Sequence, residues 1–289
     1  MDVISRIERT LTFALGRSAL PGCPPLLGQA MHHAVFPRGA RVRPRLCLAV
    51  AAACGEDAPD ATDAAAAAIE LLHCASLVHD DLPCFDDAAT RRGRPSVHKA
   101  FGQPLAVLAG DALIVLAFQT LAQGVAAVPA RLSGLMMAVG MAVGVPCGIV
   151  AGQAWECETE ADLAQYQRQK TGALFAAATV AGAASAGAEA EPWRSMGDTI
   201  GEAFQVADDL LDATADPDVI GKPVGQDAAH ERPSAVATLG VAGAMAHLRD
   251  LAEAAVASVP FCPGQRELQR HILSETLRLV PPVQARSAA

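Results

Sequence analysis

Apolar positions along this chain follow the spacing of helices and not that of strands. The run 61-ATDAAAAAIELLHCASLVH-79 combines alanine and leucine, which favour helices, with apolar residues three and four positions apart. Strand-type alternation of apolar and polar residues is scarce. No Gly/Ser-rich linker, composition break or fixed-period repeat divides the sequence. The pattern therefore predicts an all-α fold in which residues 1–289 form a single domain.

The segment 132-LSGLMMAVGMAVGVPCGIVAGQAW-155 carries no charged residue. It is long enough to span a bilayer, and its glycines at 140, 144, 148 and 152 resemble a membrane packing face. A helix that is apolar on all sides is also what the core of a large helical protein requires. We therefore interpret the segment as the central helix of a soluble bundle, kinked at Pro146, with no membrane span. A transmembrane helix is the alternative.

Composition narrows the partners and the compartment. The formal net charge is −9, which argues against nucleic acid as the main partner. Eight cysteines are scattered without a Cys-x-x-Cys pair, and several lie in apolar runs where a free thiol packs like a small core side chain. Free thiols are typical of a reducing compartment, and residues 1–15 lack the apolar stretch and cleavage site of a secretory leader. We expect a cytoplasmic protein.

Two acidic clusters lie inside apolar stretches, 80-DDLPCFD-86 and 208-DDLLD-212. Carboxylates at this density repel one another, and an apolar helix face tolerates them only when a cation neutralises them. Without histidine or cysteine partners they suit a hard ion such as Mg2+. Two such clusters facing one another across a cavity predict bound metal and a highly anionic substrate, most naturally a diphosphate.

The second cluster has the simpler geometry. Asp208 and Asp212 are four residues apart and share a helix face, with Asp209 one step around the helix. Gln205 lies on nearly the same face as Asp208 and can donate to a phosphate oxygen. Solvated acids on a surface helix are the alternative, but the apolar residues between these acids favour a cavity wall.

The first cluster cannot be one straight helix face. Asp80 and Asp86 are six residues apart, and Pro83 disfavours helical geometry at the residue before it. We expect the helix to end, widen or kink just after Asp81. The spacing from Asp80 to Asp86 is two residues longer than that from Asp208 to Asp212, and these two extra residues would bring Asp86 back toward Asp80. Asp87 is an alternative for that last position, and a helix that simply runs into an acidic loop is another.

Basic residues accompany the acids. Arg91 and Arg92 follow the first cluster closely, and two adjacent arginine forks can serve two phosphate groups. Lys170 and Thr171 open an apolar run, and Lys222 follows the second cluster. Each of these residues alone is more often a solvated surface residue. Together they indicate acids for metal, bases for phosphate and an apolar interior for the tail of the substrate.

These motifs resemble those of trans-isoprenyl diphosphate synthases, particularly the bacterial geranylgeranyl diphosphate synthases of carotenoid and bacteriochlorophyll pathways. The resemblance covers roughly residues 25–275. Its motifs are 80-DDLPCFD-86, 91-RRG-93, 105-LAVLAGDALIVLAF-118, 170-KTGALF-175, 204-FQVADDLLD-212 and 221-GK-222. The resemblance implies the isoprenoid synthase fold, a bundle of mostly antiparallel helices around a deep central cavity, in a homodimer.

The resemblance also implies head-to-tail (1'-4) prenyl transfer. Three Mg2+ ions, with Mn2+ as an alternative, would draw the diphosphate from dimethylallyl, geranyl or farnesyl diphosphate, and isopentenyl diphosphate would attack the resulting allylic cation. The implied metal-binding residues are Asp80, Asp81, Asp86, Asp208, Asp209 and Asp212. The implied allylic diphosphate site consists of Arg91, Lys170, Thr171, Gln205 and Lys222, and the isopentenyl diphosphate site of Arg43, His73 and Arg92. The catalytic subset would be Asp80, Asp86, Asp208, Lys170 and Lys222, and for His73 a role in the core is the alternative.

One departure from the family pattern concerns the isopentenyl diphosphate site. The usual Gly-Gly-Lys-Arg-x-Arg-Pro reads 38-RGARVRP-44, so Ala40 replaces a phosphate-binding lysine. Arg38 or Arg41 could compensate for it.

Two other departures preserve charge. The lysine that usually follows the Gly-Lys motif is Arg232, which we include among the substrate-binding residues. The usual Gly-Gln-x-x-Asp motif reads 152-GQAWE-156, with Glu156 in place of aspartate. These changes favour a subgroup of the family over an inactive enzyme.

Product length follows from side-chain size near the first cluster. Ala75 lies five residues before Asp80, about 7.5 Å along the helix axis toward the cavity floor. A bulky aromatic residue there would stop a growing tail early, whereas alanine and the small Ser76 leave its path open. Leu72 lies about one turn deeper and could form the floor. We therefore predict the C20 product, geranylgeranyl diphosphate.

Three alternatives remain. A synthase that stops at C15, farnesyl diphosphate, would carry an aromatic residue at position 75. A terpene cyclase would share an acidic first motif but would have an Asn/Ser/Glu metal site in place of 208-DDLLD-212. A partner subunit without activity would commonly lose one acidic cluster, and only Ala40 favours it.

Overall fold

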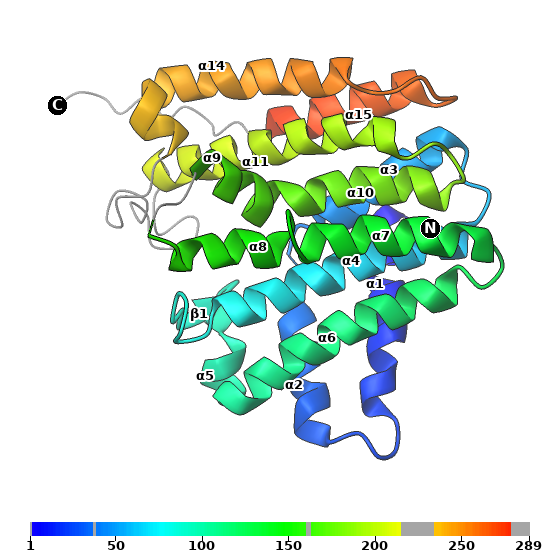
Figure 1. Cartoon of the computed structure of the whole chain (residues 1–289), viewed down its shortest axis with the longest axis vertical. Helices are drawn as coiled ribbons and strands as arrows, with labels where there is room; N and C mark the ends of the chain where they lie inside the picture. Colours follow the sequence, from blue (N-terminus) through cyan, green and yellow to red (C-terminus); the bar gives the residue numbers. More distant parts are fainter. Residues whose placement is uncertain (1, 37–38, 160–162, 215–233, 279–289) are drawn as a thin grey trace.

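The structure, a computed structural model, describes residues 2–36, 39–159, 163–214 and 234–278. Within these residues the chain is mostly helical, and its two strands, of two residues each, form one hairpin. The all-α prediction is confirmed. Figure 1 shows the helices stacked in layers, with α14 and α15 at one end and α6, α2 and α1 at the other.

The described residues of the first half of the chain form six α-helices and the hairpin. These elements are α1 (Val3–Leu15), η1 (Gly16–Ala19), α2 (Pro25–Val35), α3 (Val42–Cys54), α4 (Pro59–Asp80), β1 (Thr90–Arg91), β2 (Arg94–Pro95), α5 (Val97–Phe101) and α6 (Gln103–Gly124).

The second half contributes the helices that complete the bundle. They are η2 (Pro129–Arg131), α7 (Leu132–Val143), α8 (Ile149–Ala154), η3 (Trp155–Cys157), α9 (Leu163–Gln167), η4 (Arg168–Gly172, a π-helical turn), α10 (Ala173–Ser185), η5 (Glu191–Trp193), α11 (Arg194–Thr214), α14 (Ala235–Ala257) and α15 (Gln265–Arg278).

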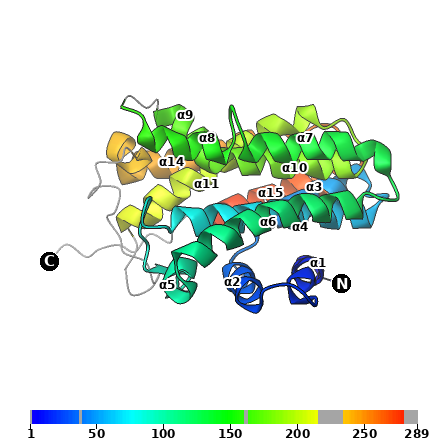
Figure 2. The same ribbon diagram turned by 60° about the horizontal axis from the view of Figure 1, so that its bottom comes forward.

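Helix α4 is the centre of the packing. Its alanine-rich middle is buried on nearly all sides because α6 covers one face, while α3 and α10 cover others. Proline at the first helical position starts it, where a missing N–H costs nothing. It runs antiparallel to α6 (Figure 1), and α1 and α2 form a further layer beside this pair (Figure 2). Consequently α4 carries Asp80, its last residue, out of the core.

The predicted kinked central helix over 132–155 is wrong. Helix α7 ends at Val143 and α8 begins at Ile149, with a cis peptide bond before Pro146 between them. The 12 residues of α7 rise only about 18 Å, less than the roughly 30 Å of a bilayer core. Helices α4 and α6 are long and apolar enough to cross a membrane by length and composition alone, and their apolar windows are 78% and 44% buried inside the protein.

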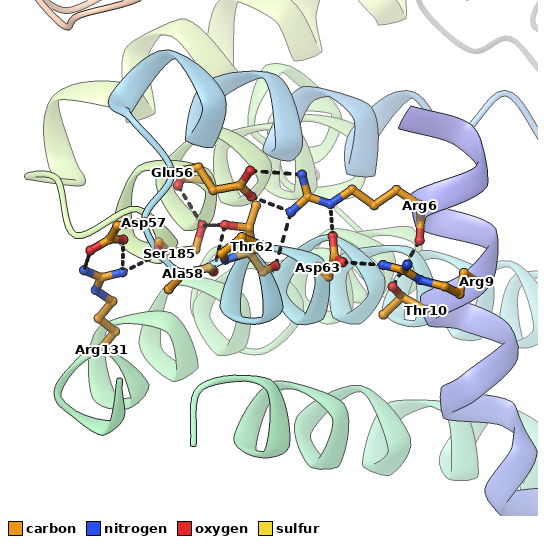
Figure 3. Close-up of polar contacts among 12 residues, drawn as sticks. Arg6, Arg9, Thr10, Glu56, Asp57, Ala58, Thr62, Asp63, Arg131 and Ser185 are labelled. Atoms are coloured by element: carbon orange, nitrogen blue, oxygen red, sulfur yellow. Dashed lines mark hydrogen bonds and ion pairs between the residues drawn. The ribbon is translucent and has the colours of Figure 1, made fainter. Parts of the chain in front are cut away.

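Ion pairs fasten the end of α4 that lies farthest from Asp80. Arg6 of α1 pairs with both Glu56 and Asp63, and Arg131 binds Asp57 at 2.6 Å (Figure 3). Pro59 at the start of α4 is 21 residues before Asp80 and Asp63 is 17 residues before it, so this network lies about 25–32 Å along the helix from Asp80. It therefore supports the scaffold and not the acidic clusters.

Close backbone approach sets the position of α11. A Cβ atom on Gly197 would lie 2.5 Å from the Cα of Ala176, and one on Gly201 would lie 2.8 Å from the Cα of Gly172. Only glycine permits this contact with α10 and η4. The turn that follows on α11 is thereby brought against η4, where Lys170 and Thr171 are located.

Candidate functional site

The first acidic cluster turns back on itself as expected. Helix α4 ends at Asp80, Asp81 follows as its cap, and the N–H of Asp86 donates to the carbonyl oxygen of Asp80 at 3.0 Å. The Leu-Pro-Cys-Phe segment between Asp81 and Asp86 therefore forms a loop that returns Asp86 to the end of the helix.

Asp87, the alternative third acid, is held by other partners. Lys99 donates to its Oδ1 at 3.0 Å, and Nε2 of His98 lies 3.3 Å from the same oxygen. The hydrogen bond from Lys99, together with its charge, lowers the pKa of Asp87. This geometry favours Asp86 over Asp87 as the partner of Asp80.

Arg91 reaches the cluster from a β-hairpin that the sequence analysis did not predict. Arg91 pairs with Arg94 across β1 and β2, and the turn uses positive φ angles at Arg92 and Gly93. The Nε of Arg91 donates to Asp81 Oδ1 at 3.0 Å. Burial raises the pKa of Asp81 although Arg91 opposes this effect. Asp81 thus anchors the hairpin, which favours a structural role over the predicted metal-binding role.

Lys170 lies between two carboxylates. Its Nζ is 3.3 Å from Oδ1 of Asp80 and 2.6 Å from Oε1 of Glu156. Burial alone would lower the pKa of Lys170, but Asp80 and Glu156 outweigh it and raise the pKa. Gly152 makes this approach possible, since a Cβ there would lie 2.5 Å from the backbone nitrogen of Lys170.

Thr171 connects the same turn to the second acidic cluster. Its hydroxyl donates to Oε1 of Gln205 at 2.9 Å, and Nε2 of Gln205 donates to Asp209 Oδ1 at 2.9 Å. Lys170 and Thr171 are consecutive in η4, so one turn contacts Asp80 on α4 and Gln205 on α11. The two acidic clusters therefore lie on either side of η4.

Within the second cluster, Asp209 is the buried member. It is 4% exposed, and its Oδ2 accepts the N–H of Ala235 at 2.7 Å, at the start of α14. Asp208 is exposed and Asp212 half-buried. Because both oxygens of Asp209 have protein partners, the geometry favours a capping role for this residue over the predicted metal-binding role.

His73, Arg43 and Arg92, the three basic residues of the predicted isopentenyl diphosphate site, are close enough to interact electrostatically. The pKa of His73 is lowered well below its usual value, first by burial and then by Arg43 and Arg92. Arg43 lies over the ring of Phe175, 4.3 Å from its centroid, and its buried Nε has no hydrogen-bond partner. Burial lowers the pKa of Arg43 to about 10, which leaves it charged at neutral pH. Contact with an aromatic ring does not use the N–H donors of a guanidinium, so an arginine held in this way can still donate hydrogen bonds to a ligand.

Arg41 cannot replace the missing lysine at position 40. Its guanidinium is buried and bonds to Glu8 at 2.9 Å, to Glu70 at 2.6 Å and to the carbonyl oxygen of Val35 at 2.9 Å. These contacts engage it fully in the core. The other candidates in the basic regions, Arg38, Lys222 and Arg232, lie outside the described residues.

A profile of the polyprenyl synthetase family matches residues 24–260 of the chain. The chain belongs to this family. Geranylgeranyl diphosphate synthase of Cereibacter sphaeroides is 52% identical over 276 residues, which are 96% of each chain. The enzyme of the same name from Rhodobacter capsulatus is 54% identical over 272 residues, 94% of each chain.

Solved structures agree with the fold of this polyprenyl synthetase. A geranyltransferase from Helicobacter pylori, complexed with magnesium and isoprenyl diphosphate, matches with a TM-score of 0.81 at 29% identity over 96% of each chain. An FPP/GFPP synthase from Zymomonas mobilis matches with a TM-score of 0.79 at 31% identity, covering 95% of this chain and 98% of that one. The predicted isoprenoid synthase fold is confirmed.

The donor atoms of this polyprenyl synthetase fit a hard divalent cation. The described part of the chain contains no preformed group of three or more His, Cys, Asp or Glu ligands. Mg2+ does not need one, because it is usually held by one or two carboxylates together with substrate phosphates and water. Oδ1 of Asp80 is buried and makes no hydrogen bond, and its ion pair with Lys170 is 3.3 Å long, so this oxygen can accept a cation in place of the ammonium group.

The predicted product-length residues lie along one stretch of α4. Ala75 and Leu72 are buried, and the hydroxyl of the half-buried Ser76 donates to the carbonyl oxygen of His73 at 2.8 Å. Sequence reasoning missed Tyr166 and Phe175 altogether. Phe175 could have been found, since it is part of the KTGALF motif. The sequence offers little indication of Tyr166 beyond its being the single tyrosine in the chain.

Proposed function

We propose that this polyprenyl synthetase condenses isopentenyl diphosphate with allylic diphosphates in a Mg2+-dependent prenyl transfer that yields geranylgeranyl diphosphate. The observation that carries this proposal is the position of the Lys170–Thr171 turn, which contacts Asp80 of the first acidic cluster on one side and, on the other, Gln205, which donates to Asp209 of the second. The two relatives above 50% identity, both named geranylgeranyl diphosphate synthase, support the C20 product.

The acidic clusters and the Lys170 turn form the allylic diphosphate site in this proposal. Mg2+ ions bound there would withdraw charge from the diphosphate as its bond to the allylic carbon breaks. Asp80, Asp86 and Asp208 would hold the metal, with Asp212 beside them. Lys170, which contacts Asp80 in this structure, would donate to a diphosphate oxygen.

The basic group around Arg43 forms the isopentenyl diphosphate site. Arg43 and Arg92 supply two guanidinium groups, and His73 is neutral because burial and the arginines disfavour its protonated form. A neutral imidazole can still donate one hydrogen bond to a phosphate oxygen. Phe175 would hold the guanidinium of Arg43 in place through its ring, 4.3 Å away.

A second copy of the chain is the proposed partner. Leu108 and Val115 on α6 and Met137 and Met141 on α7 are exposed by 42–59% although the two helices are neighbours. An apolar surface of this kind is typical of a homodimer interface. We propose a single-domain, cytoplasmic homodimer, consistent with the net charge of −9 and with a core cluster that draws on helices from α1 to α15.

The decisive experiment uses the purified chain alone. It is incubated with Mg2+, isopentenyl diphosphate and each of dimethylallyl, geranyl and farnesyl diphosphate, and the products are separated by chain length. We expect C20 to dominate with every starter. Accumulation of C15 would instead identify a farnesyl diphosphate synthase, and no consumption of isopentenyl diphosphate would indicate a partner subunit.

A further inference from the structure

The carboxylate of Glu156 joins Lys170 to a residue that the sequence motifs do not include. Tyr166 donates its hydroxyl to Oε1 of Glu156 at 2.6 Å, and Lys170 donates to the same oxygen at 2.6 Å. The second oxygen, Oε2, accepts Nε2 of Gln153 at 3.0 Å. Helix α8, η3, α9 and η4 thus each contribute one residue to a connected polar group beside Asp80.

Tyr166 contacts Lys170 by its ring as well as through the carboxylate. The Nζ of Lys170 lies 5.6 Å from the ring centroid, within reach of a cation–π interaction. Burial and the hydrogen bond to Glu156 raise the pKa of Tyr166 to about 12. The phenol therefore keeps its proton at neutral pH and acts as a hydrogen-bond donor to Glu156.

A fixed acceptor matters because lysine is flexible. Lys170 contacts Asp80 at 3.3 Å and Glu156 at 2.6 Å. If a cation occupied Asp80, Glu156 and the ring of Tyr166 would remain to position the ammonium group, with Glu156 as its hydrogen-bond acceptor. Glutamate and lysine both have several freely rotating bonds, so a pair without further contacts samples many geometries. Tyr166 and Gln153 remove this freedom from the glutamate.

We propose that Tyr166 is a positioning residue that, through Glu156, orients Lys170 toward the allylic diphosphate. This inference rests on the proposed role of Lys170 in holding that substrate. Glutamate extends its carboxylate one methylene farther than aspartate does. That added length lets one oxygen meet both the hydroxyl on α9 and the ammonium group on η4.

The test removes one hydroxyl and measures the two substrates separately. Tyr166→Phe keeps the ring over Lys170 and deletes only the hydrogen bond to Glu156. We expect the KM for the allylic diphosphate to rise about 3- to 10-fold, the effect of one hydrogen bond. The KM for isopentenyl diphosphate and the Tm should stay unchanged. Thr12→Ala, which removes a hydroxyl from exposed α1, is the matched control and should alter neither KM.

A double-mutant cycle separates positioning from general structural damage. If Tyr166 acts through Glu156, Tyr166→Phe adds no further change in a Glu156→Ala background. An unchanged allylic KM in Tyr166→Phe, equal changes for both substrates, or additive effects in the double variant would each overturn the inference. A wild-type chain that does not consume isopentenyl diphosphate would overturn the proposed function as well, so the two failures are distinguishable.

Discussion

Lys170 Nζ lies 3.3 Å from Oδ1 of Asp80, so that a residue of the π-helical turn η4 neutralises the acid that ends α4. The pair gives the half-buried carboxylate of Asp80 a cationic partner at the end of α4. In the proposed mechanism a cation bound by Asp80 would compete with Lys170 for the same oxygen, which would couple metal binding to the release of Lys170 toward substrate.

Asp80→Asn should abolish most of the activity. Loss of the carboxylate charge weakens metal binding and leaves Lys170 without one of its partners, and we expect turnover to fall at least about 100-fold, the scale of one lost electrostatic contact to the transition state. Turnover at saturating Mg2+ is the measurement. Asp57→Asn, which removes an acid at the far end of α4, is the control, and an Asp80→Asn variant that matches it would contradict the proposed metal site.

Asp208 and Asp209 should respond differently to the same change. Asp208→Asn should raise the Mg2+ concentration needed for half-maximal activity about 10- to 100-fold. Asp209→Asn should mainly lower the Tm, because the amide is a weaker acceptor for the N–H of Ala235. Mg2+ titrations of activity and thermal melts of both variants check this. A larger Mg2+ effect in Asp209→Asn than in Asp208→Asn would show that Asp209 binds metal after all.

Ala75→Phe should shorten the product. Position 75 is buried on α4 about 7.5 Å before Asp80, so a phenyl ring there would block a tail that grows toward Leu72. We expect C15 to replace C20 as the main product of an otherwise active enzyme. Chain-length analysis of the products is the measurement, and an unchanged C20 yield would refute the steric explanation.

A substitution at Arg41 should change the stability of the fold, whereas one at Ala40 should change substrate binding. Arg41→Met leaves Glu70 as an unpaired buried charge and should lower the free energy of unfolding by about 3–5 kcal/mol. Ala40→Lys adds a charge at an exposed position beside Gly39, which contacts Arg92, and should lower the KM for isopentenyl diphosphate several-fold. Denaturant unfolding and steady-state kinetics test the two variants. An Ala40→Lys variant with a higher KM for isopentenyl diphosphate would show that the absence of lysine at position 40 does not weaken substrate binding.

His73 should make the protein less stable in acid. Its pKa in the folded protein is lowered below the unfolded value of about 6.5, first by burial and then by Arg43 and Arg92. The unfolded chain therefore binds an additional proton below pH 6.5. The stability that the neutral histidine contributes is present above that pH and is lost as the pH falls.

The matching experiment compares the wild type with His73→Asn between pH 7.5 and 5. The wild type should lose up to about 1.4 kcal/mol more unfolding free energy per pH unit below 6.5 than the variant does. The remaining histidines are shared by both proteins, so the difference isolates position 73. Identical slopes would mean that His73 becomes protonated in the folded state.

The sequence by itself determined the helical class, the family and the residue types at the candidate site. Helical spacing, the aspartate pairs and the Lys170–Thr171 motif are local patterns, and local patterns can be read without a structure. The loop that returns Asp86 to Asp80 could also be predicted, because Pro83 restricts the backbone of its neighbour.

Only the tertiary structure decided which member of each motif faces which partner. Asp209 and Arg41 both lie in sequence motifs that predict metal or phosphate binding. In the structure, however, Asp209 caps α14 and Arg41 pairs with Glu70 in the core. Conversely, Phe175 reaches Arg43 from a segment far away in the sequence, and Tyr166 reaches Glu156 from a different helix. Side-chain direction depends on how helices pack, and packing depends on contacts between distant residues that no local pattern encodes.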